Sequence, residues 1–306
     1  MADIGRVAVV GGGTVGASWA ALFLAHGLDV AVYDPSPEAE GVLRDYVRRA
    51  APQLRQLGYE GEGRLRFGTD LPGVVEGARF VQENAPESED LKRRLLADLD
   101  ALLPPDAIVA SSTSALLRSA IVRECTNKGR FIVAHPFNPP HLVPLVEIVG
   151  EDEAVVARAR AFYAGLGRRP VVLRREMPGH IANRLASALY REAVYLVEQG
   201  VADVADIDAA ISDGPGLRWA VVGPHMTYHL GGGQGGIRHY LAHLGPSQVR
   251  RWASLGSPDL TPDLQDKIAQ GVADEAAGRS IADLERERDR LLLAILDAKA
   301  KARAAR

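Results

Sequence analysis

The chain has 306 residues, a net charge of −3 at pH 7 and a hydrophobic content of 47%, a composition typical of a globular protein long enough for two domains. The slight negative charge excludes an electrostatic nucleic-acid interface, and the single cysteine, Cys125, excludes an internal disulfide and favours a reducing compartment. The N-terminus has no basic segment and the apolar run at residues 14–25 is too short to span a membrane, so we expect a cytoplasmic protein with no membrane partner.

The first predicted element is a short apolar strand at residues 7–10, which leads directly into the pattern Gly11-x-Gly13-x-x-Gly16 and an apolar helix. In this context the three glycines permit, in order, a tight turn, close approach of the backbone to a diphosphate, and close packing of helix on strand. The helix N-terminus offers N–H groups and a partial positive charge to the same diphosphate. We therefore predict dinucleotide contacts at Gly11, Gly13, Thr14, Val15 and Gly16.

The second predicted strand, residues 29–33, ends at Asp34, which stands eighteen residues after Gly16. A carboxylate at this place can accept hydrogen bonds from the ribose hydroxyls of a dinucleotide and would repel a 2′-phosphate. The next two residues, Pro35 and Ser36, supply no arginine that would bind such a phosphate. The sequence therefore predicts NAD, not NADP, as the cofactor.

Strands and helices alternate from here to about residue 175. Further strands are predicted at residues 65–67, 80–83, 108–111, 131–134, 145–149 and 170–173. Helical period and length mark residues 14–26, 37–57, 88–103, 115–124 and 153–166. Such alternation is typical of βαβ units, so we predict an α/β fold with a Rossmann-type, doubly wound and mainly parallel sheet.

The pattern changes after Pro178-Gly179. Helical patterns follow at residues 180–199, 203–213, 262–277 and 280–303, with no convincing strand between them, and the glycine-rich stretch 231–236 is predicted to be a flexible or tight loop. We therefore predict an NAD-binding domain over residues 1–177 and an all-helical domain over residues 178–306. The helical domain would bind substrate and form a homodimer, because residues 180–199 carry more apolar positions than one packed face needs.

Chemistry-bearing side chains gather in four segments that the predicted fold brings toward its ligand crevice at the strand ends. They are Ala110–Ser114, His135–Pro139, Glu147 and Gly179–Arg184. Oxidation of a secondary alcohol needs a group that takes the proton from oxygen, and a histidine that titrates near neutrality can do so while a carboxylate stabilises the imidazolium. A serine hydroxyl and an asparagine amide can polarise a carbonyl in the reverse direction.

The chain resembles the 3-hydroxyacyl-CoA dehydrogenase superfamily in motifs that occur in the right order between residues 6 and 185. These motifs are Gly11–Gly16, Gln82–Glu87, Ser111–Ser114, His135–Pro139, Leu145–Glu147 and Asn183–Leu185. The resemblance implies His135 as the catalytic base, Glu147 as its orienting carboxylate, and Ser114 and Asn183 as ligands of the reacting oxygen. It also implies a homodimer and cofactor contacts at Glu87, Lys92, Ser114 and Asn138.

Four of these assignments have alternatives. A neighbouring hydroxyl of the run Ser111-Ser112-Thr113 could take the role of Ser114. Asn183 could instead cap or brace a helix. Glu87 and Lys92 lie on a predicted surface helix, where a solvated ion pair would serve no ligand.

The substrate is the least determined part of the prediction. The first lysine of the chain is Lys92, so the lysine-rich hairpin with which acyl-CoA-acting members of the superfamily bind CoA is missing, although arginines occur at residues 44, 48, 49 and 55. Residues 213–220 and Gly223-Pro224 resemble the branch that acts on small free hydroxy acids, which includes L-gulonate 3-dehydrogenase (lambda-crystallin) and L-carnitine dehydrogenase. The glycine-rich loop and residues 238–240 favour the carnitine side. An acyl-CoA dehydrogenase, a polyketide ketoreductase and a non-catalytic NAD(H)-binding protein remain as alternatives.

A small hydroxy acid needs a cationic partner, and Arg218 is the residue predicted to bind its carboxylate, with a structural salt bridge as the alternative. Trp219, Tyr228 and Trp252 could form an aromatic wall for a quaternary ammonium group, or could simply pack in the core. The histidine pairs His225/His229 and His239/His243 lack acids or cysteines at ligand spacing. We therefore expect no metal.

Overall fold

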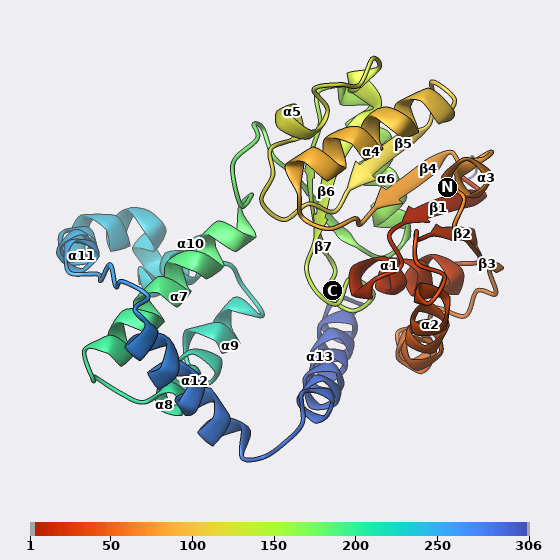
Figure 1. Cartoon of the computed structure of the whole chain (residues 1–306). Coiled ribbons are helices and arrows are strands. Elements are labelled where there is room, and N and C mark those ends of the chain that lie inside the picture. The colour runs from red at the N-terminus through yellow and green to blue at the C-terminus, as the bar shows by residue number, and fades with distance from the viewer. Residues whose placement is uncertain (1–3, 305–306) are drawn as a thin grey trace. The chain divides into compact units, whose positions relative to one another are not determined.

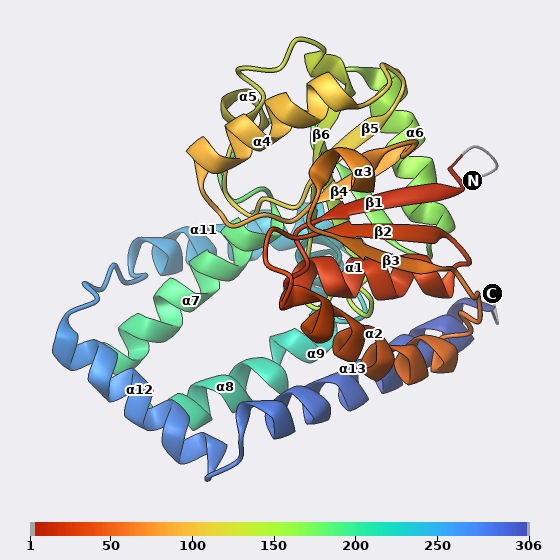
Figure 2. The ribbon, with the colours of Figure 1, turned by 45° about the vertical axis from the view of Figure 1, so that its right-hand side comes forward.

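The computed structural model describes residues 4–304, which form two compact units (Figures 1 and 2). The first unit contains residues 4–184 together with Asp289–Asp297 of the last helix. The second contains Leu185–Arg288 and the residues that follow Asp297.

The first unit is built on an eight-stranded sheet in the order β3-β2-β1-β4-β5-β6-β7-β8. The strands are β1 (Arg6–Val10), β2 (Asp29–Tyr33), β3 (Leu65–Gly68), β4 (Phe80–Glu83), β5 (Ile108–Ser111), β6 (Phe131–Pro136), β7 (Leu145–Val149) and β8 (Arg169–Val172). Its helices are α1 (Thr14–Ala25), α2 (Ala39–Gln56), α3 (Leu71–Val75), α4 (Glu89–Leu102), α5 (Arg118–Ile121) and α6 (Glu153–Gly165), with a 3₁₀ turn η1 (Lys128–Arg130). All eight predicted strands are present, and the predicted doubly wound, mainly parallel sheet is confirmed.

Each face of the sheet has its own hydrophobic core, because successive side chains of a strand point to opposite faces. Val7 and Val9 of β1 belong to the core that α1, α2 and α6 cover, whereas Ala8 and Val10 belong to the core under α3, α4 and α5. The views in Figures 1 and 2 show α4 and α5 on one side of the sheet and α1 and α2 on the other. Burial on both faces explains why β1, β2 and β5 are nearly continuous apolar runs in the sequence, whereas the edge strands β3 and β8 are partly exposed and contain arginine.

The sheet departs from a purely parallel one at β7, which runs antiparallel to β6. Glu147 therefore lies inside β7 and not at the carboxyl end of a strand, which corrects our expectation for this residue. The hairpin register pairs His135 directly with Glu147. Their spacing of twelve residues is thus the length of chain that turns back from β6 into β7.

The glycine-rich turn between β1 and α1 has the steric constraints that the motif predicts. Gly11 has φ of +97°, and a Cβ there would lie 2.7 Å from the carbonyl oxygen of Asn84. A Cβ on Gly16 would lie 1.9 Å from the carbonyl oxygen of Gly11, whereas one on Gly13 would meet open space. Protein packing thus requires glycine at residues 11 and 16. At residue 13 the protein itself has room for a side chain, so the expected reason for glycine there is the close approach of a ligand.

The described residues of the second unit form helices joined by turns and loops, with no strand. Its elements are α7 (Ala182–Glu198, beginning in the first unit), α8 (Val204–Ser212), α9 (Pro215–Trp219), α10 (Pro224–Gly231), η2 (Gly233–Gly235), α11 (Gly236–Ala253), α12 (Pro262–Ala276) and α13 (Ile281–Ala304). Its small core centres on Val194, Val197, Ile207 and Leu264. Within residues 4–304, no helix has both the length and the apolar character needed to cross a membrane.

Several helix predictions were incomplete. The helix expected over residues 115–124 is limited to α5, and α3, α9, α10 and α11 were not predicted. The glycine-rich stretch is a tight 3₁₀ turn between α10 and α11, and Gly233 and Gly236 adopt φ of +58° there. Glycine and an internal proline, Pro246 of α11, lower the helix propensity of this region, so local pattern alone does not identify its helices.

We predict that Gly16→Ala destabilises the first unit and that Gly13→Ala does not. Alanine within a helix normally stabilises it relative to glycine. A loss of stability in Gly16→Ala would therefore be due to the clash between the new Cβ and the Gly11 carbonyl oxygen. Overpacking of this kind costs about 1–3 kcal/mol, or a fall in Tm of roughly 3–10 °C. Thermal unfolding measures the difference, and equal Tm values for both variants would contradict the prediction.

Candidate active site

A pocket of about 230 Å³ opens at the carboxyl ends of β4, β5 and β6, beside the start of α1. Ten residues line it: Val15, Asn84, Ala85, Glu87, Lys92, Ser112, Ser114, His135, Pro136 and Asn138. Six of these were predicted from the sequence as catalytic or cofactor-binding residues. The fold therefore gathers the predicted residues at the crevice where doubly wound sheets bind ligands.

His135 and Glu147 form a buried pair at this site. His135 is 4% exposed and Glu147 is 1% exposed, and the His135 Nδ1 and Glu147 Oε2 atoms are 2.9 Å apart. A carboxylate only accepts hydrogen bonds, so Nδ1 carries the proton and Nε2 has the lone pair. This arrangement leaves Nε2 as the nitrogen that can accept a proton.

The second oxygen of Glu147 binds the backbone where α7 begins. Its Oε1 atom accepts hydrogen bonds from the N–H groups of Ile181 at 2.9 Å and Ala182 at 3.1 Å. Burial by itself raises the pKa of the Glu147 carboxyl, but the hydrogen bonds from His135, Ile181 and Ala182 outweigh burial and lower that pKa below its ordinary value. Glu147 is therefore a carboxylate at neutral pH, and each of its oxygens holds a partner in place.

Ser114 lies in a turn after β5 that Glu87 organises. The Glu87 Oε1 atom accepts hydrogen bonds from the N–H groups of Ser114 and Ala115, at 2.9 and 3.0 Å, and from the hydroxyls of Thr113 and Ser114, at 2.6 and 3.2 Å. Asn183 donates from Nδ2 to the backbone carbonyl of Ser114 at 3.3 Å. The structure thus places Ser114 and Asn183 together, and Glu147, not Asn183, binds the N–H groups that precede the helix.

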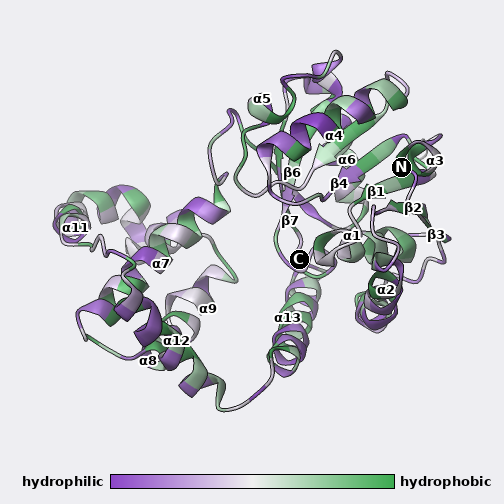
Figure 3. Ribbon diagram, viewed as in Figure 1, coloured by the Kyte–Doolittle hydropathy of each residue, from purple (hydrophilic) through white to green (hydrophobic). Residues whose placement is uncertain are grey.

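Lys92 is buried, which contradicts the alternative of a solvated pair on a surface helix. Its side chain is 1% exposed, and Nζ lies 2.7 Å from Glu83 Oε1 and 2.8 Å from the carbonyl oxygen of Ala85. Glu87 is farther away, at 3.9 Å, and stands before α4 begins. The α4 helix carries both hydrophilic and hydrophobic residues along its length (Figure 3). In such an amphipathic helix, the sequence pattern predicts that a lysine side chain faces solvent.

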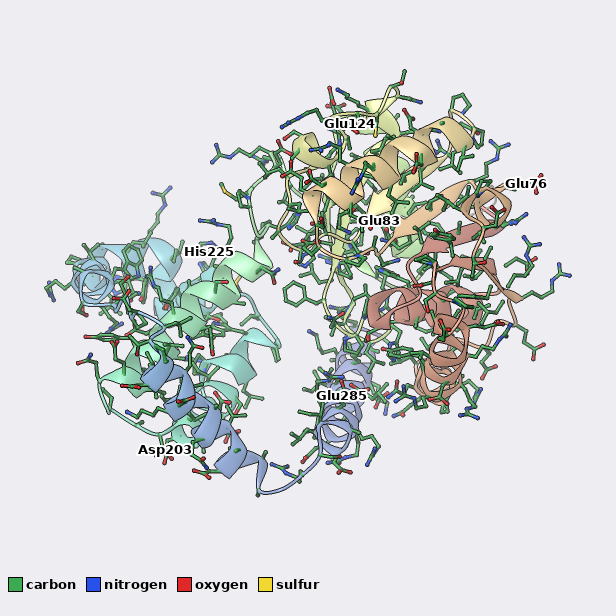
Figure 4. The ribbon with its side chains drawn as sticks, in the orientation of Figure 1. Glu76, Glu83, Glu124, Asp203, His225 and Glu285 are labelled. Atoms are coloured by element: carbon green, nitrogen blue, oxygen red, sulfur yellow. The ribbon has the colours of Figure 1, made fainter. Side chains whose placement is uncertain are left out.

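Glu83 was not predicted as a site residue, although it ends β4 immediately before the pocket (Figure 4). Its buried carboxylate also accepts hydrogen bonds from the Ala85 N–H at 2.6 Å and from the Ser111 hydroxyl. These partners join the ends of β4 and β5 to α4. The sequence did contain a signal for this residue, because Glu83 is a charged residue at the end of a predicted buried strand.

The residues near the glycine-rich turn fit a dinucleotide. The α1 helix begins after Gly13 with no side chain capping its N–H groups, which leaves them to an anion. Asp34 follows β2 directly and accepts hydrogen bonds from the Gly12 N–H at 2.8 Å and the Ser36 N–H at 3.0 Å. These bonds fix the carboxylate at the end of the strand and leave lone pairs for hydroxyl donors.

His180 is a second histidine that the sequence prediction did not assign, although it stands in the predicted segment Gly179–Arg184. It is 2% exposed and has φ of +52°, and its ring stacks on that of His135 with centroids 5.0 Å apart and planes 18° apart. Its Nδ1 atom lies 3.3 Å from the Ser114 carbonyl oxygen. The signal available in the sequence was a histidine placed directly after Pro178-Gly179.

The residues predicted to recognise substrate through charge or aromatic contact lie in the second unit. Arg218 is an exposed residue of α9, and its side chain forms no ion pair with any residue of the described range 4–304. The Tyr228 ring pairs with Tyr240 at 4.7 Å, and Trp219 and Trp252 are 40% and 61% exposed. Both tryptophans therefore lie outside the core of this unit.

Three of the histidines in the second unit, His229, His239 and His243, contact neighbouring protein groups. The rings of His239 and His243 stack at 4.0 Å, and His229 Nδ1 accepts the Ile237 N–H at 3.1 Å. Over the part of the chain that the structure describes, no three His, Cys, Asp or Glu side chains converge on a place that could hold a metal ion.

Two family models cover most of the chain. Residues 6–177 match the model described as 3-hydroxyacyl-CoA dehydrogenase, NAD binding domain, and residues 179–275 match 3-hydroxyacyl-CoA dehydrogenase, C-terminal domain. Among curated relatives, the L-carnitine dehydrogenase of Streptomyces griseus subsp. griseus is 49% identical over 302 residues, which are 97% of this chain and 90% of that protein. The L-carnitine dehydrogenase of Pseudomonas aeruginosa is 46% identical over 97% of this chain and 94% of its own length.

The fold is also similar to that of solved structures. The crystal structure of 5-formyl-3-hydroxy-2-methylpyridine 4-carboxylic acid 5-dehydrogenase, described as an NAD⁺-dependent dismutase, matches with a TM-score of 0.82 and 32% identity. The match covers 95% of this chain and 97% of that one. Together these comparisons confirm two predictions: the cofactor is NAD, and the chain is an oxidoreductase that acts on a CH–OH group.

Proposed function

The chain belongs to the 3-hydroxyacyl-CoA dehydrogenase family, and on that premise we propose that it oxidises a small free 3-hydroxy acid of the carnitine type to the 3-keto acid. The observation that carries this proposal is the 42–49% identity, over almost the whole chain, to relatives named L-carnitine dehydrogenase. The missing lysine-rich hairpin supports a free acid over an acyl-CoA, because the first lysine is Lys92. That lysine is itself buried in an ion pair.

His135 is the proposed proton acceptor. Its Nε2 atom takes the hydroxyl proton of the substrate while the Nδ1–H donates to Glu147 at 2.9 Å. As the ring becomes an imidazolium, the buried carboxylate supplies the counter-charge in a place where water screens it little. The pair needs no rearrangement, because the β6–β7 register fixes both residues on neighbouring strands.

Ser114 and Asn183 are the proposed ligands of the substrate oxygen. The amide of Asn183 and the hydroxyl of Ser114, which would rotate from Glu87 Oε1 toward the substrate, are neutral donors that favour partial negative charge on that oxygen. Their support is the turn that Glu87 organises and the hydrogen bond from Asn183 to the Ser114 carbonyl. A rigid support of this kind reduces the reorganisation that the transition state requires.

The glycine-rich turn, the start of α1 and Asp34 are the proposed NAD-binding residues, with Asn138 of the pocket wall near the reacting end. When bound, NAD supplies the acceptor for the hydride that leaves the alcohol carbon. Asp34 is proposed to set the preference for NAD, since its carboxylate would bind ribose hydroxyls and repel a 2′-phosphate. Lys92 contributes through the buried pair with Glu83, which holds the residues after β4 against the pocket.

We expect NADH formation to be fastest with L-carnitine among carnitine, gulonate, 3-hydroxybutyrate and 3-hydroxybutyryl-CoA, and faster with NAD than with NADP. His135→Gln should lower kcat by at least about 100-fold, because a positioned general base contributes about 10²–10⁴. NADH affinity of this variant, followed by fluorescence titration, should stay within about twofold of the wild type. A higher kcat/KM with the CoA thioester than with any free acid would refute the proposal.

Arg218 is proposed to bind the substrate carboxylate. Arg218→Met keeps the length of the side chain and removes its charge, so an interaction that ground and transition states share would be lost. Loss of a charge-assisted contact of about 1.5–3 kcal/mol raises KM roughly ten- to a hundredfold with little change in kcat. Arg160→Met is the control, since Arg160 is an exposed arginine on α6. Equal KM values for the two variants would exclude Arg218 from substrate binding.

The helical unit is proposed to form a homodimer through apolar residues of α7. Leu185 and Leu189 are 58% and 37% exposed, although Val194 of the same helix is buried. Light scattering at micromolar concentration should give twice the mass of one chain, and Leu185→Glu should lower the measured mass toward that of a single chain. Val42→Glu, at an equally exposed apolar residue of α2, is the matched control. A wild-type protein that is monomeric under these conditions would refute the dimer.

A further inference from the structure

His180 occupies a left-handed backbone conformation, which is uncommon for residues other than glycine, although histidine adopts it more often than most of them. Its φ is +52°, in the left-handed region where non-glycine residues are uncommon and usually strained. The preceding residue, Gly179, also has a positive φ, of +72°. Glycine or asparagine would fit the conformation of residue 180 with less strain, so the imidazole at this place calls for an explanation in its contacts.

The His180 ring contacts both His135 and the turn that contains Ser114. One face stacks on His135 at 5.0 Å. Its Nδ1 atom is 3.3 Å from the Ser114 carbonyl oxygen, which accepts, so Nδ1 carries the proton in the neutral ring. Asn183 donates to the same carbonyl at 3.3 Å. The ring therefore contacts the proposed proton acceptor and the turn that holds a proposed oxygen ligand.

The charges around His180 come from three elements. His135 faces it from β6, Glu147 from β7, and Glu87 from the segment before α4. Burial lowers the pKa of His180 below its usual value, and the neighbouring His135 lowers it further, while the Ser114 hydrogen bond and the two glutamates oppose this less strongly. At neutral pH the ring is therefore uncharged.

We propose that His180 is a positioning residue for the oxidation: its neutral ring holds the plane of His135 from one face, and protonation of His180 stops turnover. The inference rests on the proposed function, in which His135 accepts the substrate proton. During oxidation His135 becomes an imidazolium. A protonated His180 stacked on it would place two like charges face to face in a buried site, which opposes that proton uptake.

A distinctive pH dependence follows from this arrangement. Oxidation requires both histidines to be neutral before the substrate proton is transferred. Well below the titration of both rings, the logarithm of kcat/KM should therefore rise with pH with a slope of two. If His180 only filled space, the loss of one proton from His135 would give a slope of one.

Two variants distinguish the effect of the His180 ring from the effect of its protonation. His180→Phe keeps a stacking ring that cannot be protonated, and it should retain kcat within about fivefold at pH 8 while the acid slope falls from two to one. His180→Asn removes the ring but tolerates the positive φ and keeps an amide donor for the Ser114 carbonyl. It should lower kcat about tenfold or more, with NADH affinity within twofold and Tm within about 3 °C of the wild type. His243→Asn, at an exposed histidine of α11, is the control.

The inference is overturned by a slope of two in His180→Phe, by a slope of one in the wild type, or by a wild-type kcat in His180→Asn. It is also overturned if His180→Asn loses NADH affinity and Tm along with kcat, since that pattern marks a structural role. His135→Gln, measured in parallel, keeps the two proposals apart. Turnover that survives His135→Gln refutes the proposed function, whereas an inactive His135→Gln beside unaffected His180 variants refutes only this inference.

Discussion

The carboxylate of Glu147 is the interaction on which the rest of the site depends. One of its oxygens meets His135 and the other meets the two N–H groups where α7 begins. A buried carboxylate with only one partner would be protonated or would draw in water, because an unsatisfied charge in a protein interior is costly. The backbone donors keep Glu147 ionised, and its ionised form in turn fixes which nitrogen of His135 is free. The orientation of the proposed base thus depends on the backbone path at the start of a helix.

A second buried carboxylate with several hydrogen-bond partners lies near the pocket. Glu83 ends β4 as a buried carboxylate and is compensated by Lys92, the Ala85 N–H and the Ser111 hydroxyl. Glu83 stands at the end of β4 and Glu147 inside β7, and each carboxylate ties its strand to a helix, Glu83 to α4 through Lys92 and Glu147 to the start of α7. Such pairs add little net stability, since desolvation offsets most of the attraction. Their effect is to specify one conformation for the residues that line the pocket.

Most of the fold and part of the site could be predicted from the sequence, and the reasons differ from element to element. The inner strands of the first unit are buried on both faces, so they stand out as short apolar runs, whereas the edge strands β3 and β8 are only partly buried. The glycine-rich turn is recognisable because sterics permit no side chain at Gly11 or Gly16. The burial of Lys92 could not be predicted, since its partner Glu83 comes from a strand nine residues earlier and only the fold turns the two together. The pairing of His180 with His135 depends in the same way on a contact between distant segments.

The ionised carboxylates of Glu147 and Glu87 keep the framework of the site together as the pH falls. Glu147 and Glu87 have lowered pKa values, so the stability they contribute is present above the pKa of an ordinary glutamate and is lost only as pH falls through the lower, folded value. Burial and the neighbouring His135 lower the pKa of His180 as well, so its ring is uncharged at neutral pH. Down to the folded pKa values of the two glutamates, the framework of hydrogen bonds around Glu147 and the Ser114 turn stays ionised and intact. Loss of turnover within that range would therefore be reversible, because the hydrogen bonds that hold the site persist.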